Sequence, residues 1–271
     1  MEKALLIVSF GTSCPEVLER DIVPVERAIQ EALPEYVPLR AFGSGMIARK
    51  LRQRDGVVIP TVAEALEALR GQGVRELLVQ PTFLLRGREY DMLMRQLGDA
   101  AQWFPHIRVG RPLLSAAEDY LALAAELARR FPREEGPLVL MGHGTEHHAN
   151  AAYSILEAAL CREGQNHILI GTVEGDPSLD TLCRRLLAEG VGRVSLMPLM
   201  LVAGDHAVND MASEASGSWK SRLQAQGIEA RCILRGLGSW EFIQKLYAAH
   251  ALEAASSREG LDIPGKDDKL R

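Results

Sequence analysis

The sequence lacks the patterns that would point to several common classes of protein. No run approaches the roughly 18 apolar residues of a membrane-spanning helix. The apolar stretch from Ala4 to Val8 is shorter than the core of a signal peptide, so we expect a cytoplasmic protein that does not act at a membrane. No C-x-x-C pair is present, so neither a zinc ribbon nor a dithiol redox site is indicated, and the cysteines are isolated at Cys14, Cys161, Cys183 and Cys232.

An excess of basic residues is also absent. The 271 residues carry a formal net charge of -5, whereas a broad nucleic-acid-binding surface normally needs a basic excess, so we predict no nucleic acid partner. The Gly-Thr turns lack the spacing of a nucleotide-binding loop, and no G-x-S-x-G elbow follows a strand. What remains is an ordinary composition, 47% hydrophobic and 25% charged, in a chain long enough to bury a core without disulfides.

What the sequence does contain is an internal repeat. KALLIVSFGTS, from Lys3, matches GPLVLMGHGTE, from Gly136, and this match places Phe10 opposite His143. GVRELLVQPTFLLRGRE matches GVGRVSLMPLMLVAGDH in the same way and places Glu89 opposite His206. The two motifs lie farther apart in the first half, and we attribute the difference to the segment AFGSGMIARKLRQR.

Short apolar strands alternate with amphipathic helices in both halves. Thr61 and Glu64 form a capping box at the start of one predicted helix. We expect Asp176 and Pro177 to begin the matching helix of the second half, and Gly190 to end it.

This alternation predicts an α/β fold with two similar lobes, each built on a parallel sheet flanked by helices. We place the first lobe at residues 1–130, the second at 131–255 and a polar tail at 256–271. Pro24 is expected to kink the first helix of the first lobe.

Polar side chains follow several of the predicted strands. Open α/β sheets bind ligands beyond the carboxyl ends of their strands, so we expect these residues to converge on a cleft between the lobes. His143 and His206 would form a pair of metal ligands there. Glu174 is either a third ligand, which would complete a site for a divalent first-row metal, or a carboxylate that interacts with the dipole of the following helix. Glu89 either faces the metal from the other lobe and accepts protons, or is a surface residue.

The remaining histidines have simpler interpretations. His147 and His148 are predicted at the start of a helix, and His106, His167 and His250 at the surface. Positive charge is concentrated in MIARKLRQR and beside Glu89, and it is either a solvated face or an attraction for a substrate with several carboxylates; the basic residues are Arg49, Lys50, Arg52, Arg86 and Arg88.

Six motifs occur in a characteristic order: VSFGTS, RAFGSGMIARKL, PTFLLRGREYD, LMGHGTEHHANAAY, GTVEGDPS and PLMLVAGDHAVND. From Lys3 to Leu252 the chain resembles the anaerobic cobalt chelatases of cobalamin biosynthesis, the sirohydrochlorin cobaltochelatase family. The resemblance implies a chelatase fold with two α/β lobes around a tetrapyrrole cleft. It also implies insertion of Co²⁺, as the substrate metal and with no organic cofactor, into sirohydrochlorin, with release of two protons.

The resemblance assigns roles to residues of this chain. It implies that His143, Glu174 and His206 bind the metal and that Glu89 is the acidic residue of the first lobe. Arg49, Arg86 and Arg88 are candidates to bind the substrate's carboxylates. One position departs from the family pattern, because Phe83 stands where relatives often carry a histidine. A role tied to that histidine, including the haem binding of exported relatives, is therefore not expected.

Three alternatives stay open on the residues alone. The same site could insert Fe²⁺ into sirohydrochlorin for sirohaem synthesis, since nitrogen and oxygen ligands do not separate these metals sharply. The chain could be a non-catalytic protein that binds or stores metal or tetrapyrrole. A histidine phosphatase is disfavoured because Gly142 occupies the position where an arginine is expected. The oligomeric state, a homo-oligomer included, is also open.

Overall fold

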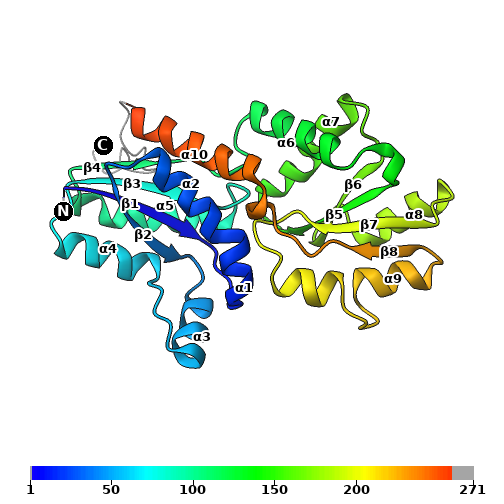
Figure 1. Ribbon diagram of the computed structural model, residues 1–271, viewed down its shortest axis with the longest axis horizontal. Coiled ribbons are helices and arrows are strands. Elements are labelled where there is room, and N and C mark those ends of the chain that lie inside the picture. The colour runs from blue at the N-terminus through cyan, green and yellow to red at the C-terminus, as the bar shows by residue number, and fades with distance from the viewer. Residues whose placement is uncertain (1, 258–271) are drawn as a thin grey trace, which may run out of the picture. The chain divides into compact units, whose positions relative to one another are not determined.

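The computed structural model describes residues 2–257, and their contacts divide the chain into two compact units (Figure 1). The first unit runs to Leu113 and resumes at Ile243, and the second is Leu114–Phe242. This division differs from the predicted boundaries, because residues 117–130 belong to the second unit and the helix that follows residue 240 packs with the first. The predicted polar tail lies outside the described residues from position 258 onward.

The sheet of the first unit has four parallel strands in the order β2-β1-β3-β4. The central strand, β1, is buried from Ala4 to Ser9, as expected for a parallel strand covered on both faces. The strands are β1 (Lys3–Ser9), β2 (Val37–Phe42), β3 (Glu76–Pro81) and β4 (His106–Val109).

Helices cover both faces of this sheet (Figure 1). On α4, the Thr61 hydroxyl accepts a hydrogen bond from the Glu64 backbone N–H, and the Glu64 carboxylate accepts one from the Thr61 N–H at 2.8 Å, so the predicted capping box is confirmed. The helix changes its geometry close to Pro24, which lacks a backbone N–H. A π-helix ends at Ile22, and the regular helix α2 begins at Val23. The helical elements are α1 (Pro15–Val17), η1 (Leu18–Ile22), α2 (Val23–Ala32), α3 (Gly45–Asp55), α4 (Val62–Gly71), α5 (Arg88–Ala100), η2 (Ala101–Trp103) and α10 (Glu241–Ser256).

The second unit repeats this topology. Its sheet has the strand order β6-β5-β7-β8. Adding four to each strand number of the first sheet gives this order, so the repeat seen in the sequence is confirmed. The strands are β5 (Leu138–Gly144), β6 (Ile168–Glu174), β7 (Arg193–Pro198) and β8 (Glu229–Cys232). The helical elements are α6 (Ala117–Arg130), η3 (Arg133–Glu135), η4 (His148–Asn150), α7 (Ala151–Arg162), α8 (Leu179–Ala188), η5 (His206–Met211), α9 (Trp219–Ala225) and η6 (Leu237–Ser239).

The start of α8 differs from the prediction. Ser178, not Asp176, is the N-cap, and its hydroxyl accepts a hydrogen bond from the Thr181 N–H. The Pro177 carbonyl accepts a hydrogen bond from the Thr172 N–H at 2.8 Å, which ties Pro177 to β6, and the helix begins two residues later than predicted. The first unit has the same arrangement, since the Pro60 carbonyl accepts from the Phe42 N–H just ahead of the Thr61 cap.

The extra segment of the first half is α3. Only four residues separate β6 from α8, whereas the whole of α3 lies between β2 and α4. This confirms that the inserted segment predicted from the unequal spacing belongs to the first unit alone.

Each unit has its own hydrophobic core. In the first, Leu66 of α4 and Leu97 of α5 pack against the strands, and in the second Leu186 of α8 and Leu223 of α9 do the same. Each buried leucine stabilises its unit by about 1.5–3 kcal/mol. Within residues 2–257, no helix combines the length and apolarity required to cross a bilayer.

Candidate metal site

Two histidines that are distant in the sequence meet at the carboxyl edge of the second sheet. His143 is near the end of β5, and His206 opens η5 after β7, the neighbour of β5. Their ring centroids lie 4.7 Å apart, and the ring planes meet at 84°. The structure therefore brings together two of the three metal ligands expected from the sequence.

In both histidines, Nδ1 forms a hydrogen bond with a protein oxygen. His143 Nδ1 lies 2.9 Å from the Gly144 carbonyl oxygen, which can only accept, so Nδ1 carries the hydrogen and Nε2 keeps its lone pair. His206 Nδ1 lies 2.6 Å from the Asp210 carboxylate, which fixes the same tautomer. Two neutral imidazoles with free Nε2 atoms are suitable donors for a first-row divalent metal.

Asp210 was not predicted as a site residue. It lies four residues after His206 on the same helical turn, and both side chains are about 45% exposed. A carboxylate on the second nitrogen of a metal-binding histidine orients the ring and raises its basicity. The sequence signal was the spacing H-x-x-x-D, which has meaning only once His206 is known to be helical.

The environment of His206 differs from the prediction. We expected His206 to follow a strand directly, but β7 ends at Pro198, so a loop separates His206 from the strand. The reason is that the carbonyls of Met200 and Leu201 accept hydrogen bonds from Leu237 and Gly238, and this pairing draws the backbone away from the sheet.

Glu174 is the last residue of β6, and its backbone pairs with Gly144. Gly144 has φ +79, and a Cβ at this position would lie 1.6 Å from the Glu174 carbonyl oxygen, so only glycine lets the two strands approach here. The Glu174 side chain is exposed. Among residues 2–257, no three His, Cys, Asp or Glu side chains are gathered as a ready-made metal site, so the carboxylate of Glu174 does not join the two rings in this conformation.

The first unit has a separate cavity at the carboxyl edge of its own sheet. This cavity, of about 230 Å³, is lined by Glu89 together with Phe10, Phe83 and Met92. Glu89 is the second residue of α5 and is exposed. Phe83 is 7% exposed, and the Tyr247 hydroxyl donates to its carbonyl at 2.9 Å.

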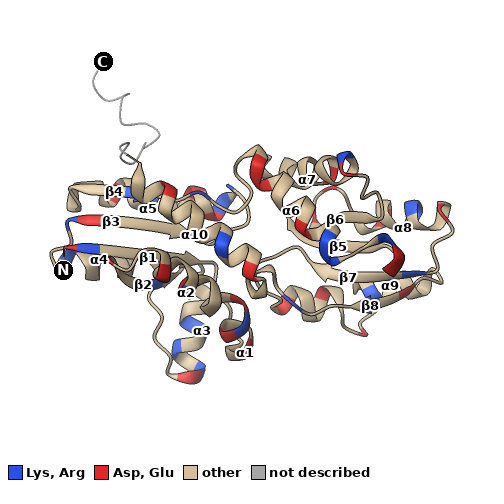
Figure 2. Ribbon diagram, turned by 45° about the horizontal axis from the view of Figure 1, so that its top comes forward, with Lys and Arg blue, Asp and Glu red and all other residues tan. Residues whose placement is uncertain are grey.

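The candidate carboxylate-binding arginines lie on two elements of the first unit. Arg49 is on α3, where Figure 2 shows several basic residues, and Arg88 is the first residue of α5. Arg86 lies over the Tyr90 ring, 6.0 Å from its centroid. In the described part of the chain neither Arg49 nor Arg86 forms an ion pair, whereas Arg52 pairs with Glu64 at 3.1 Å.

Two histidines predicted at the surface are buried. His167 is 8% exposed with Nε2 2.9 Å from the Phe131 carbonyl, and His250 is 1% exposed with Nδ1 3.3 Å from the Arg111 carbonyl. Both partners are far away in the sequence, so the local pattern gave no sign of them. The prediction for His147 and His148 is confirmed, because they lie at the start of the turn before α7, with ring centroids 3.9 Å apart.

Two four-stranded parallel sheets of the same strand order define the fold class of this chain. The solved structure of SirB from Bacillus subtilis with Fe³⁺ has the same fold, with a TM-score of 0.63, 14% identity, and coverage of 94% of this chain and 96% of that one.

Sequence comparisons narrow this class to one family. The family model for cobalt chelatase (CbiK) matches residues 3–256. A sirohydrochlorin cobaltochelatase of Salmonella typhimurium is 44% identical over 256 residues, which are 94% of this chain and 97% of that protein. The sirohydrochlorin cobaltochelatase CbiKC of Nitratidesulfovibrio vulgaris is 32% identical over 94% of this chain and 92% of that protein. The chain belongs to the cobalt chelatase family.

Proposed function

We propose that this protein is a sirohydrochlorin cobaltochelatase, which inserts Co²⁺ into sirohydrochlorin and releases the two pyrrole protons. The observation that carries the proposal is the pair His143 and His206, whose rings lie 4.7 Å apart and whose Nε2 atoms have no hydrogen-bond partner among residues 2–257. The 44% identity to a protein of that name over nearly the whole chain supports the choice of metal and tetrapyrrole.

In this proposal the histidine pair receives the substrate metal. His143 and His206 bind Co²⁺ through Nε2, and Glu174, on the strand beside His143, turns toward the ion as a third ligand. Three protein ligands leave positions on the metal for the ring nitrogens of the substrate. Holding a partly dehydrated ion against one face of the ring lowers the entropic cost of the reaction.

The two protons leave as the pyrrole nitrogens replace the protein ligands. Glu89 accepts one of them, and a histidine that has released the metal accepts the other. The net charge of the tetrapyrrole does not change, because one dication enters the ring as two protons leave it.

The carboxylates of sirohydrochlorin require cationic partners. We assign this role to Arg49, Arg86 and Arg88, and the lack of an ion pair on Arg49 and Arg86 within residues 2–257 supports it. Charge-assisted hydrogen bonds from guanidinium groups to carboxylates are suited to such recognition. The cytoplasmic location stays a prediction of the sequence.

An anaerobic absorbance assay tests the function. A small amount of the protein is mixed with a large excess of sirohydrochlorin and Co²⁺, and parallel reactions contain Fe²⁺ or Ni²⁺ in place of Co²⁺. We expect many turnovers with Co²⁺ and a lower kcat/KM with the other metals. A single stoichiometric absorbance change would identify a binding protein instead, and faster insertion of Fe²⁺ would identify an enzyme of sirohaem synthesis.

A further inference from the structure

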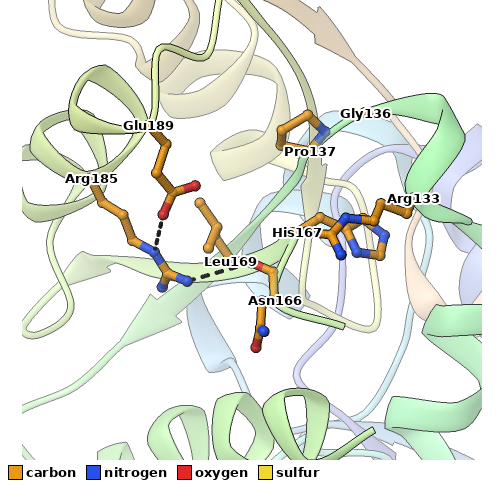
Figure 3. Close-up of a pocket in the computed structure, with 8 residues that line it drawn as sticks. All are labelled: Arg133, Gly136, Pro137, Asn166, His167, Leu169, Arg185 and Glu189. Atoms are coloured by element: carbon orange, nitrogen blue, oxygen red, sulfur yellow. Dashed lines mark hydrogen bonds and ion pairs between the residues drawn. The ribbon is translucent and has the colours of Figure 1, made fainter. Parts of the chain in front are cut away.

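A larger cavity lies in the second unit, at the opposite edge of the sheet from the histidine pair. It has a volume of about 350 Å³ and opens where β5 and β6 begin, between the turn η3 and the C-terminal end of α8 (Figure 3). Leu138 and His143 are five residues apart on β5, which at about 3.3 Å per residue puts about 17 Å between the cavity and the proposed metal site. A molecule bound in this cavity would therefore not touch the histidine pair.

The charges around this cavity do not balance. Arg185 is fully engaged, since it contacts Glu157 at 3.0 Å, Glu189 at 3.2 Å and the Asn166 carbonyl at 3.4 Å. Arg133 also lines the cavity, yet its exposed guanidinium has no ion pair with any residue in 2–257. One cationic group with five N–H donors is thus left for an anion.

The cavity wall also contains an unused acceptor. His167 is 8% exposed, and its Nε2 lies 2.9 Å from the Phe131 carbonyl, so Nε2 carries the hydrogen and Nδ1 has a lone pair. Nδ1 is buried and has no hydrogen-bond partner among the described residues. A buried acceptor without a donor costs free energy, and this cost is removed by a ligand that brings an O–H or N–H.

We propose that this cavity binds inorganic phosphate. Near neutral pH this ion carries both anionic oxygens, which suit the guanidinium of Arg133, and a P–O–H, which can donate to Nδ1 of His167. Sulfate and ionised carboxylates have the charge without the hydrogen. The proposal concerns binding alone and is independent of the chelatase function.

Isothermal titration calorimetry at about pH 8, where an ordinary histidine is neutral, tests the site. The probes are inorganic phosphate and two anions without a P–O–H at this pH, glycerol phosphate and sulfate. We expect saturable binding of inorganic phosphate, and binding of sulfate that is about tenfold weaker or more, since a hydrogen bond to a charged group is lost.

Three variants locate the site. Arg133→Gln should weaken phosphate binding about tenfold to a hundredfold. Arg193→Gln removes the same charge at the same sheet edge, from a residue that pairs with Glu229 and lies outside the cavity, and should leave binding unchanged. His167→Gln keeps a donor for Phe131 but removes the Nδ1 acceptor, so it should abolish the preference for phosphate over sulfate.

Several results would overturn the proposal. They are the absence of saturable phosphate binding by the unmodified protein, equal binding of phosphate and sulfate, and equal effects of Arg133→Gln and Arg193→Gln. Circular dichroism of each variant shows whether the fold is retained. If His167→Gln does not fold, the phosphate preference is tested with Arg133→Lys, which keeps the charge and the acceptor and should retain the preference with weaker binding.

Discussion

The two units share one scaffold and differ in the side chains placed on it. β1 and β5 occupy the same central position, as do β3 and β7 beside them. At the carboxyl edge, the first unit has an apolar cavity lined by Phe10 with a single carboxylate, Glu89, whereas the second has the histidine pair. A repeated fold thus supplies equivalent positions, and different side chains at those positions give the two sheet edges different chemistry: an apolar cavity with a carboxylate in one unit and a pair of imidazoles in the other.

The largest effect should come from removing a histidine of the pair. His206→Ala should lower cobalt insertion by about 100-fold or more, because the proposed mechanism loses one of its two imidazole ligands for the metal. His148→Ala removes an exposed histidine a few residues beyond His143 and should retain activity. Steady-state rates under anaerobic conditions measure both, and equal rates would remove His206 from the site.

Gly144, the last residue of β5, and Gly11, two residues after the end of β1, offer a matched test of stability. Gly144→Ala places a Cβ 1.6 Å from the backbone oxygen of Glu174 at a positive φ, and we expect a loss of about 3 kcal/mol in the free energy of unfolding. Gly11→Ala also has a positive φ, but its nearest neighbour at 2.6 Å is the side chain of the buried Phe42 and not a paired backbone atom. Urea denaturation should show the smaller loss at Gly11; the reverse order would contradict the packing described here.

Asp210 should act through His206. Asp210→Asn keeps the size of the side chain but removes the charge that orients the ring, so the apparent affinity for Co²⁺ should fall about tenfold to a hundredfold. The matched control is Asp205→Asn, an exposed neighbour. The measurement is the dependence of rate on Co²⁺ concentration at saturating sirohydrochlorin, where a change in kcat alone would argue against a positioning role.

The helix caps should show the smallest effect and the closest equivalence between the units. Thr61→Ala and Ser178→Ala each remove one side-chain acceptor at the start of α4 or α8, and each should cost about 1 kcal/mol of stability. Chemical denaturation gives both values. A clear loss at only one position would mean that the two caps are not equivalent.

The sequence predicted those features that repeat or that depend on near neighbours. Two matched motifs were enough to place His143 and His206 at one sheet edge, and the spacing of Thr61 and Glu64 was enough for the capping box. These features need only strand order and local hydrogen bonds.

The features that escaped prediction depend on distant partners. Ser178 caps α8 because the Pro177 carbonyl is held by β6, and Asp210 reaches His206 only because the segment after a loop is helical. His167 is buried against the end of α6, and the sequence around it contains no sign of that contact. Tertiary hydrogen bonds of this kind have no local signature.

The Tyr247 hydroxyl, on α10, donates to the carbonyls of Thr82 and Phe83, just after β3. Tyr247 follows the whole of the second unit in the sequence. The ribosome must therefore complete the second unit before the Tyr247 hydroxyl can form its hydrogen bonds to Thr82 and Phe83. During synthesis the unit with the histidine pair can therefore fold first, whereas the unit with Glu89 can complete its fold only after α10 has been synthesised.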